Sequence, residues 1–531
     1  MRRRDFLKSG LALGVTAGAA RTAPLSAQAE GFVRTHNWDK FDFGPGPVAR
    51  DRLNQGPFPQ YPPDAVIPGD DVVMTTMPSD EVVPNYGKGL ITYITADKGT
   101  EEIQSDNVPK AIDDLVALPL GQKLYVRPTW REVQPRRGKL ELPEYLQQVF
   151  ALARSSGKRV ALRVQMCAPD YSHAPALPDF VLNDVPKVDL VLANQQDRAE
   201  AERYLKNPWA RWQPRYDSPV FQDAFRELVG LLAAEFDGHP TIEFIDTFMY
   251  GFWGEGHTWP FSNNPFPDYA TAERTWVKML EVQLDAFRHT PLTTNTQPDF
   301  SRVGNSELLD RTVRAHNWIR SDTIFIENEQ IEALSNRPPW VAAVLEQGLP
   351  ARAPGPRDAD GIAPAENMMA HVMDVGVNYW SLWNFHAISA ANLQRYYAAY
   401  PEWFDRINRR IGYRVRPSFI WSYDDGGQCG LIAGFANDGI AGVPGLLRVT
   451  VESAEGHTLA SGCLDAGYPL PGKIRQAQFV LPAGTRWQGL KMRAEIEVKG
   501  MRFPVLWACR QKLNEDGSLT LRANLGRGQA A

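Results

Sequence analysis

Two glutamates stand in sequence surroundings where a charged side chain is unusual. Glu255 ends a run of glycine and aromatic residues that begins at Asp246, and Glu346 ends the apolar run 340–345. Two carboxyl groups can break a glycosidic bond, because one protonates the leaving oxygen while the other attacks the sugar carbon or activates water. Each glutamate also has a plainer interpretation, a local hydrogen bond for Glu255 and a loop cap for Glu346. The two together favour the catalytic interpretation.

The elements that must position these glutamates follow a regular alternation. From about residue 84 to 414, short apolar strands alternate with helix-length amphipathic segments, which predicts parallel β/α architecture. Eight such units fit one (β/α)8 TIM barrel. A doubly wound open sheet is the alternative, but no glycine-rich phosphate loop follows the first strand. The expected strands are 90–95, 123–127, 160–165, 242–248, 292–295, 318–325, 341–346 and 377–382.

This barrel would bring the two glutamates together. Side chains at the carboxyl ends of barrel strands form the active site. Glu255 follows the fourth expected strand and Glu346 ends the seventh, and these ends face each other across the mouth. The long excursion 166–216, after the third strand, is expected to build the rim. Glu327 and Glu329, just past the sixth strand, are the alternatives to Glu346.

Two of the connecting helices can be placed by their ends. One helix should stop at Gly157, a residue type that favours the left-handed conformation after a helix. Another should begin at Pro219, with Ser218 as its cap.

Residues 1–29 are predicted to be a targeting segment. Arg3 and Arg4 begin a twin-arginine consensus, a short apolar stretch follows, and the segment 27–29 carries the small residues of a cleavage site. A basic tail is the alternative interpretation. We therefore expect the twin-arginine translocase to export the folded chain to the periplasm or beyond. No other apolar run is long enough for a membrane span, so the mature chain is not expected in a membrane.

The segments that flank the barrel have distinct compositions. Residues 30–83 are rich in proline, glycine and aspartate, which predicts an extended arm with little regular structure. From about 415 to 525 the pattern is purely β, with apolar residues alternating along 492–498 and further strands expected at 430–437 and 446–452. This predicts a separate antiparallel β-sandwich.

Composition excludes several classes of function. The chain has 531 residues, 43% hydrophobic and 22% charged, with a net charge of −5 and no long basic run, which disfavours nucleic acid and acidic membranes as partners. Its nine histidines form no HxH or HExxH pattern and its four cysteines no CxxC pair, so neither a metal nor a cofactor is expected. A disulfide is not required, although two of Cys429, Cys463 and Cys509 could pair after export.

Several motifs together resemble a known family. They are NYGKG (85–89), WREVQP (130–135) with Gly138, LRV (162–164), GE (254–255) and YWSLWN (379–384). In this order they resemble bacterial β-galactosidase-like barrels of the clan A glycoside hydrolases, over about residues 84–510. The resemblance implies that Glu255 is the acid/base and Glu346 the nucleophile. Clan members usually carry asparagine before the acid/base; this chain has Gly254, and Asn295 is the expected substitute.

These inferences predict a retaining glycosidase acting on poly- or oligosaccharide. Glu255 should have a raised pKa because Phe252 and Trp253 would desolvate it, while Arg127 or Arg163 would keep Glu346 ionised. The two arginines could instead recognise an acidic sugar or form buried ion pairs. A carbohydrate-binding or polysaccharide-assembly protein is the alternative, as is a metal- or cofactor-dependent exported enzyme. Expected sugar contacts are Arg127, Trp130, Arg163, Tyr171, Trp253, Trp259, Asn295, Trp380, Trp383 and Asn384.

Overall fold

The computed structural model describes most of the chain after residue 71. The described ranges are 72–170, 174–192, 198–207, 209–261, 265–296, 305–321, 328–346, 364–382, 388–424 and 429–521. The predicted targeting segment and most of the predicted arm lie outside them.

Eight parallel strands close into a barrel, as the alternation predicts. Around the barrel the order of neighbours is β10-β11-β2-β3-β4-β7-β8-β9, and β11 closes on β2 with Trp380 opposite Leu90. All eight expected strands are present, so the (β/α)8 fold is confirmed. The strands are β2 (Gly89–Tyr93), β3 (Lys123–Val126), β4 (Arg159–Leu162), β7 (Ile242–Asp246), β8 (Leu292–Asn295), β9 (Trp318–Ser321), β10 (Ala343–Leu345) and β11 (Tyr379–Leu382).

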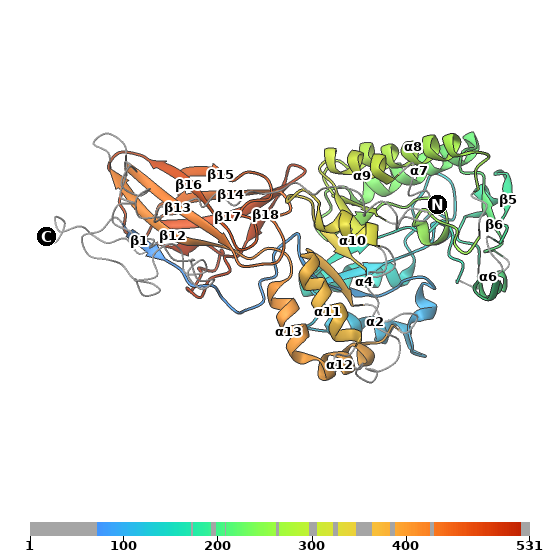
Figure 1. The fold of residues 1–531 in the computed structure, drawn as a ribbon, viewed down its shortest axis with the longest axis horizontal. Helices are drawn as coiled ribbons and strands as arrows, with labels where there is room; N and C mark the ends of the chain where they lie inside the picture. Colours follow the sequence, from blue (N-terminus) through green and yellow to red (C-terminus); the bar gives the residue numbers. More distant parts are fainter. Residues whose placement is uncertain are drawn as a thin grey trace, which may run out of the picture. The chain divides into compact units, whose positions relative to one another are not determined.

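Helices form the outer layer of the barrel (Figure 1). In α7 the Ser218 hydroxyl accepts a hydrogen bond from Phe221 N at 3.2 Å, and α4 stops at Gly157 with φ 67°, both as predicted. The helices of this layer are α2 (Val108–Ala117), α4 (Glu144–Ser156), α7 (Pro219–Phe236), α8 (Tyr269–Ala286), α9 (Asn305–Arg314), α10 (Asn328–Ser335), α11 (Pro364–Val375), α12 (Ala390–Ala399) and α13 (Pro401–Arg410).

The excursion between β4 and α7 folds onto the loop that follows β7. Four side chains of the excursion form a small apolar cluster with Phe252 and Phe261 of that loop: Cys167, Ala201, Tyr204 and Ala210. The excursion therefore packs against the loop that carries Glu255. Its elements are α5 (Asp179–Leu182), α6 (Arg198–Leu205) and a two-stranded ribbon of β5 (Lys187–Asp189) and β6 (Trp212–Pro214).

Two antiparallel sheets follow the barrel, as the β pattern predicts. In β17 the residues Met492, Ala494, Ile496 and Val498 are all buried, which is the expected alternation. One sheet is ordered β1-β12-β13-β16 and the other β15-β14-β17-β18, with β19 also on β17. The strands are β1 (Val72–Thr75), β12 (Val415–Asp424), β13 (Cys429–Asn437), β14 (Leu446–Glu452), β15 (Thr458–Cys463), β16 (Ile474–Leu481), β17 (Lys491–Val498), β18 (Met501–Val505) and β19 (Leu519–Thr520).

The strand β1 was not expected, because the sequence predicts an irregular arm up to residue 83. Thr75 pairs with Phe419 of β12, more than three hundred residues later in the chain. A four-residue strand has little local signal, and its hydrogen bonds come entirely from this distant partner. Residues 72–75 are therefore part of the first sheet.

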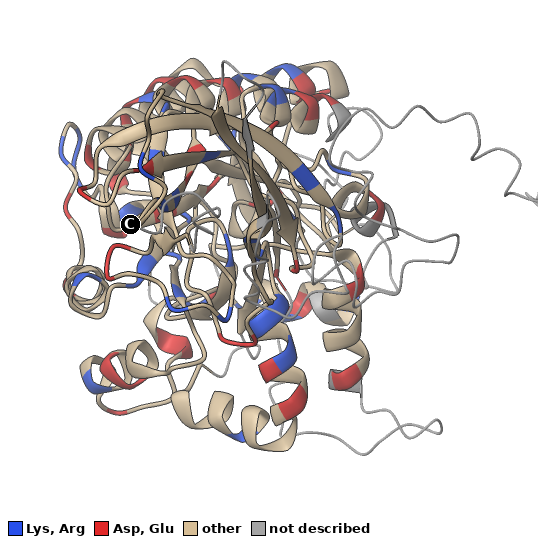
Figure 2. Cartoon of the chain, turned by 90° about the vertical axis from the view of Figure 1, so that its left-hand side faces the viewer, with Lys and Arg blue, Asp and Glu red and all other residues tan. Residues whose placement is uncertain are grey.

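Charged residues of both signs are interspersed along the chain. Figure 2 shows lysine and arginine alternating with aspartate and glutamate along the outer helices. Among the helices of the described ranges, none combines the length and the apolar character that crossing a membrane requires.

Candidate active site

Glu255 and Glu346 both lie buried at the carboxyl ends of barrel strands. Glu346 directly follows β10, and its residue is 1% exposed, against 4% for Glu255. The fourth barrel strand, β7, ends at Asp246 instead of the expected Phe248, so Glu255 belongs to the loop beyond it. The residue at the strand end itself is Asp246, which is also buried.

The loop that carries Glu255 is closed by its own backbone. Phe252 N donates to His257 O at 2.8 Å, and Gly256 N donates to Tyr250 O at 2.9 Å. Gly251 has φ 83°, and a Cβ atom there would lie 2.1 Å from His257 O, so only glycine fits. Gly254, where the resemblance leads one to expect asparagine, also has a left-handed φ of 76°. The glycines therefore give this loop its shape.

Arg127 connects the two glutamates. It follows β3, and its Nη2 atom contacts Glu346 Oε1 and lies 3.6 Å from Glu255 Oε1. Its other amino nitrogen, Nη1, lies 2.7 Å from Asp97 Oδ1. Since both glutamate oxygens lie against one nitrogen, they are at most about 6 Å apart, a separation that suits two carboxyl groups acting on one bond.

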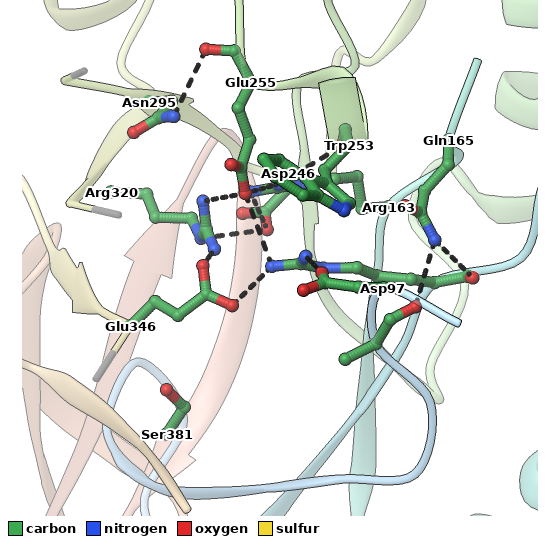
Figure 3. A network of polar contacts seen from close by, with 12 residues as sticks. Asp97, Arg163, Gln165, Asp246, Trp253, Glu255, Asn295, Arg320, Glu346 and Ser381 are labelled. Carbon is green, nitrogen blue, oxygen red and sulfur yellow. Dashed lines mark hydrogen bonds and ion pairs between the residues drawn. The ribbon is translucent and has the colours of Figure 1, made fainter. Parts of the chain in front are cut away.

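Two further arginines complete a buried ionic cluster (Figure 3). Arg163 Nη1 lies 2.6 Å from Glu255 Oε1, and its Nη2 lies 3.1 Å from Asp246 Oδ2. Arg320, on β9, contacts Glu346 Oε2 and lies 3.6 Å from Glu255 Oε1 and 3.3 Å from Asp246 Oδ2. The expected partner of Glu346 was Arg127 or Arg163; in the structure Arg127 contacts it, and Arg163 contacts Glu255.

The charges of this cluster are close to balance. Arg127, Arg163 and Arg320 face four carboxyl groups, those of Asp97, Asp246, Glu255 and Glu346. Buried charges are costly unless each is paired, and here each arginine already contacts at least two carboxylates. The arginines therefore carry no excess positive charge for an acidic sugar.

Neutral hydroxyl groups anchor two of the carboxylates. Tyr93 OH donates to Glu346 Oε1 at 2.9 Å, and the hydroxyls of Tyr125 and Thr293 donate to Asp246. These donors come from β2, β3 and β8, so strands from around the barrel fix the carboxylate positions.

The pKa of Glu255 is shifted opposite to the prediction. Burial alone would raise this pKa, but the hydrogen bond from His257 and the charges of Arg163, Arg127 and Arg320 together hold it well below its usual range. The prediction of a raised pKa was therefore wrong. The prediction considered only the apolar neighbours in the same loop, whereas His257 of that loop lowers the pKa and the arginines come from other parts of the barrel.

Asp97 is the carboxyl group whose pKa is shifted the other way. Burial raises the pKa of Asp97 well above its usual range; Arg127 opposes this shift, while Glu102, Asp170 and Glu255 add to it. Asp97 follows β2, the first barrel strand, so it belongs to the same mouth as the two glutamates. Two acids with opposite shifts therefore lie around Arg127.

The predicted sugar contacts divide into groups. Trp253 is part of the loop that carries Glu255, and its backbone oxygen accepts a hydrogen bond from Arg163 Nη1 at 3.4 Å. Asn295 reaches this loop from β8, and its Nδ2 donates to Glu255 O at 3.4 Å. The contact of Asn295 is with the backbone of Glu255. Trp259 is 48% exposed, and no contact places it at the ionic cluster among the described residues.

Two predicted contacts, Trp130 and Trp380, lie in the core instead. Trp130 is fully buried with its ring edge-on to Phe180 and Phe221, and Trp380 is fully buried beside Phe404. The structure does not bring these tryptophans to the cluster, because their aromatic surfaces are covered by apolar neighbours. Outside the described residues lie Tyr171, Trp383, Asn384, Glu327 and the side chain of Glu329.

Arg320, Asp246 and Asp97 were not among the predicted site residues. Arg320 lies inside a strand whose four residues are all buried, and Asp246 ends another fully buried strand. A charge within an apolar strand is the same signal that identified Glu346, so it could have identified both. Asp97 follows its strand by several residues and carries no comparable signal.

No metal site is found in the ranges that the structure describes. No group of three histidine, cysteine, aspartate or glutamate residues there is arranged to hold an ion. All four cysteines are free thiols, including the three considered for a disulfide.

Comparison with known proteins gives a likeness of fold only. No family model matches the chain, and no curated protein does. Among solved structures, endo-glycoceramidase II from Rhodococcus sp. is 13% identical, over 77% of this chain and 100% of that one, with a TM-score of 0.35. The β-galactosidase from Rahnella sp. R3 is 13% identical, over 64% and 59%, with a TM-score of 0.37. GH5_18 from Streptomyces cattleya is 16% identical, over 57% and 71%, with a TM-score of 0.33. Likenesses this weak carry no argument about activity.

Proposed function

We propose that this chain hydrolyses glycosidic bonds in poly- or oligosaccharides at the mouth of its barrel. The observation that carries the proposal is the contact of Glu255 and Glu346 with one nitrogen of Arg127, although the two side chains come from opposite parts of the barrel. Glycoside hydrolysis needs two carboxyl groups on either side of one bond. Glu346 directly follows a barrel strand and Glu255 lies in the loop beyond another, on the side of the barrel where active sites of this fold form, which supports the proposal.

Glu346 is the proposed nucleophile. Arg127 and Arg320 contact its two oxygens, and Tyr93 donates a hydrogen bond to one of them. These three residues belong to β2, β9 and the end of β3, so three parts of the barrel fix the position of this carboxylate. A carboxylate that attacks must be ionised and oriented, and cations with a fixed hydrogen-bond donor provide both conditions. The nearest oxygens of the two glutamates are at most about 6 Å apart, and retention, with roughly 5–5.5 Å between the carboxyl groups, is the stereochemical outcome that we propose.

The charge balance of the cluster favours a neutral sugar. Each of the three arginines already contacts carboxylates, and the four acids would outnumber them if all were ionised. A uronate or sulfate would add an anion to a site whose arginines are already paired with carboxylates, which costs free energy. A sugar bearing only hydroxyl groups meets no such cost.

The test is hydrolysis of a panel of neutral and acidic aryl glycosides by the mature protein. We expect turnover of at least one neutral glycoside, its loss in Glu346→Ala, and its return with inverted product configuration when azide fills the cavity left by the carboxylate. Glu235→Ala, on the exposed side of α7, is the matched control and should retain full activity. If Glu346→Ala matches the wild-type rate, the assignment fails. If the wild type binds sugars but hydrolyses none, the protein is a carbohydrate-binding protein instead.

A further inference from the structure

We infer that Asp97, and not Glu255, is the proton donor to the leaving group. This inference rests on the proposed function. It starts from the guanidinium of Arg127, which holds Asp97 on Nη1 and Glu346 on Nη2. Asp97 and the proposed nucleophile are thereby held by the two amino nitrogens of one rigid planar group.

The number of cations around each carboxylate separates Asp97 from the others. Glu255 lies within 3.6 Å of three arginines, and Glu346 and Asp246 each contact two. Among the ion pairs of the described residues, Asp97 has one arginine partner, Arg127. A cation favours the ionised form of a carboxyl group. Asp97 is therefore the member of the cluster that its surroundings stabilise least as an anion.

Its other neighbours have the same effect. Glu102 in the 3₁₀ helix Thr100–Glu102, Asp170 beyond β4 and Glu255 beyond β7 are negative groups that disfavour a further charge at Asp97. Together with burial they give Asp97 its raised pKa, against the opposing charge of Arg127. Glu255 has a depressed pKa in the same cluster, so it lacks the proton that a leaving group requires.

Access points to the same residue. The Asp97 side chain is 9% exposed, against 4% for Glu255 and 1% for Glu346 and Asp246. Asp97 is thus the acid of the cluster that solvent reaches most readily.

The chemical step then balances. The Asp97 carboxyl gives its proton to the glycosidic oxygen as the C–O bond breaks, and the leaving group departs as an alcohol. The Glu346 carboxylate forms a bond to the anomeric carbon. In the second half, Asp97 takes a proton from a water molecule as that water attacks the anomeric carbon, and Glu346 leaves with the bonding electrons. Glu255 stays ionised throughout and stabilises the positive charge that develops on the sugar ring.

The experiment compares Asp97→Asn with Glu255→Gln on glycosides of the same sugar with different leaving groups. For an alkyl alcohol, Asp97→Asn should lower kcat/KM by about 10²–10⁴-fold, the usual contribution of general acid catalysis, and for dinitrophenol by less than about tenfold. Glu255→Gln should reduce both substrates to a similar extent, because charge stabilisation does not depend on the leaving group. The opposite pattern would assign the proton to Glu255 and overturn the inference.

The pH profile supplies a readout that a structural role would not move. Activity should fall as pH rises through the pKa of Asp97, and Asp97→Asn should abolish this basic limb. Asp170→Asn removes a negative neighbour, so it should shift the limb to lower pH while leaving the leaving-group dependence unchanged. A basic limb that remains in Asp97→Asn contradicts the inference.

A second measurement needs no turnover. In protein labelled with ¹³C at aspartate carboxyl groups, one resonance should titrate above the ordinary aspartate range, move down in Asp170→Asn and be absent in Asp97→Asn. If no aspartate titrates there, the inference fails even if the enzyme is active. If the wild type hydrolyses no glycoside, the proposed function fails, and this titration still decides whether Asp97 holds the proton.

Discussion

Arg320 offers the sharpest test of the buried cluster, because its replacement should unbalance three carboxylates at once. Its side chain is fully buried, and it contacts Glu346, Glu255 and Asp246. Removing one partner of a buried ion pair costs about 3–5 kcal/mol, because the other charge stays buried without compensation. Methionine preserves most of the volume, so Arg320→Met should lower the free energy of unfolding by about that amount at pH 7.

Two variants isolate the electrostatic part of this loss. Arg311 forms its ion pairs at the surface with a side chain 37% exposed, so Arg311→Met should cost at most about 1 kcal/mol. The double variant Arg320→Met with Glu346→Gln removes one cation and one anion, and it should recover most of the stability lost in Arg320→Met.

The assay is urea unfolding followed by tryptophan fluorescence, at pH 7 and pH 5. Without Arg320 the buried carboxylates lose a compensating positive charge and repel one another more strongly. Their pKa values therefore rise, and they take up protons as pH falls. The destabilisation should therefore shrink at pH 5. A loss for Arg320→Met no larger than that for Arg311→Met, or a larger loss that is independent of pH, would refute the reasoning.

Three further predictions concern other parts of the chain. The pKa of Glu255 is depressed in the folded protein, so its ionised form stabilises the fold above the unfolded-state pKa, and this contribution disappears as pH falls through the folded-state value. Glu255→Gln should therefore lower the free energy of unfolding at pH 7 and lower it progressively less in acid. Urea unfolding at several pH values measures this difference. Gly251→Ala should cost at least about 3 kcal/mol and impair turnover, because its Cβ would lie 2.1 Å from a carbonyl oxygen, whereas Gly138→Ala, with nothing within 4 Å, should cost only about 1–2 kcal/mol of backbone strain. We also propose export by the twin-arginine route: replacing Arg3 and Arg4 by lysine should retain the precursor in the cytoplasm, and unchanged delivery to the periplasm in cell fractions would refute this route.

The order and number of the barrel strands could be predicted from the sequence, and so could the β domain that follows them. These features depend on local periodicity, since buried strands are short apolar runs and half-buried strands alternate along the chain. The seventh strand, β10, ends at Leu345, one residue before the predicted end at Glu346, because a charged residue after an apolar run marks the approach of a strand end. The start of α7 at Pro219 has the same local origin, a cap and a proline in consecutive positions.

Most of the electrostatics of the site was decided by the tertiary structure. The pKa of Glu255 depends on burial and on His257 of the same loop, and also on three arginines that lie far apart in the sequence and meet only when the barrel closes: Arg163, Arg127 and Arg320. Trp130 shows the same limit for packing: its motif suggested a sugar contact, but Phe180 and Phe221 cover it in the fold. A sequence pattern shows which residue types follow each strand. Which of these residues interact electrostatically depends on distances across the barrel, because Coulomb interactions between buried groups act through space and not along the chain.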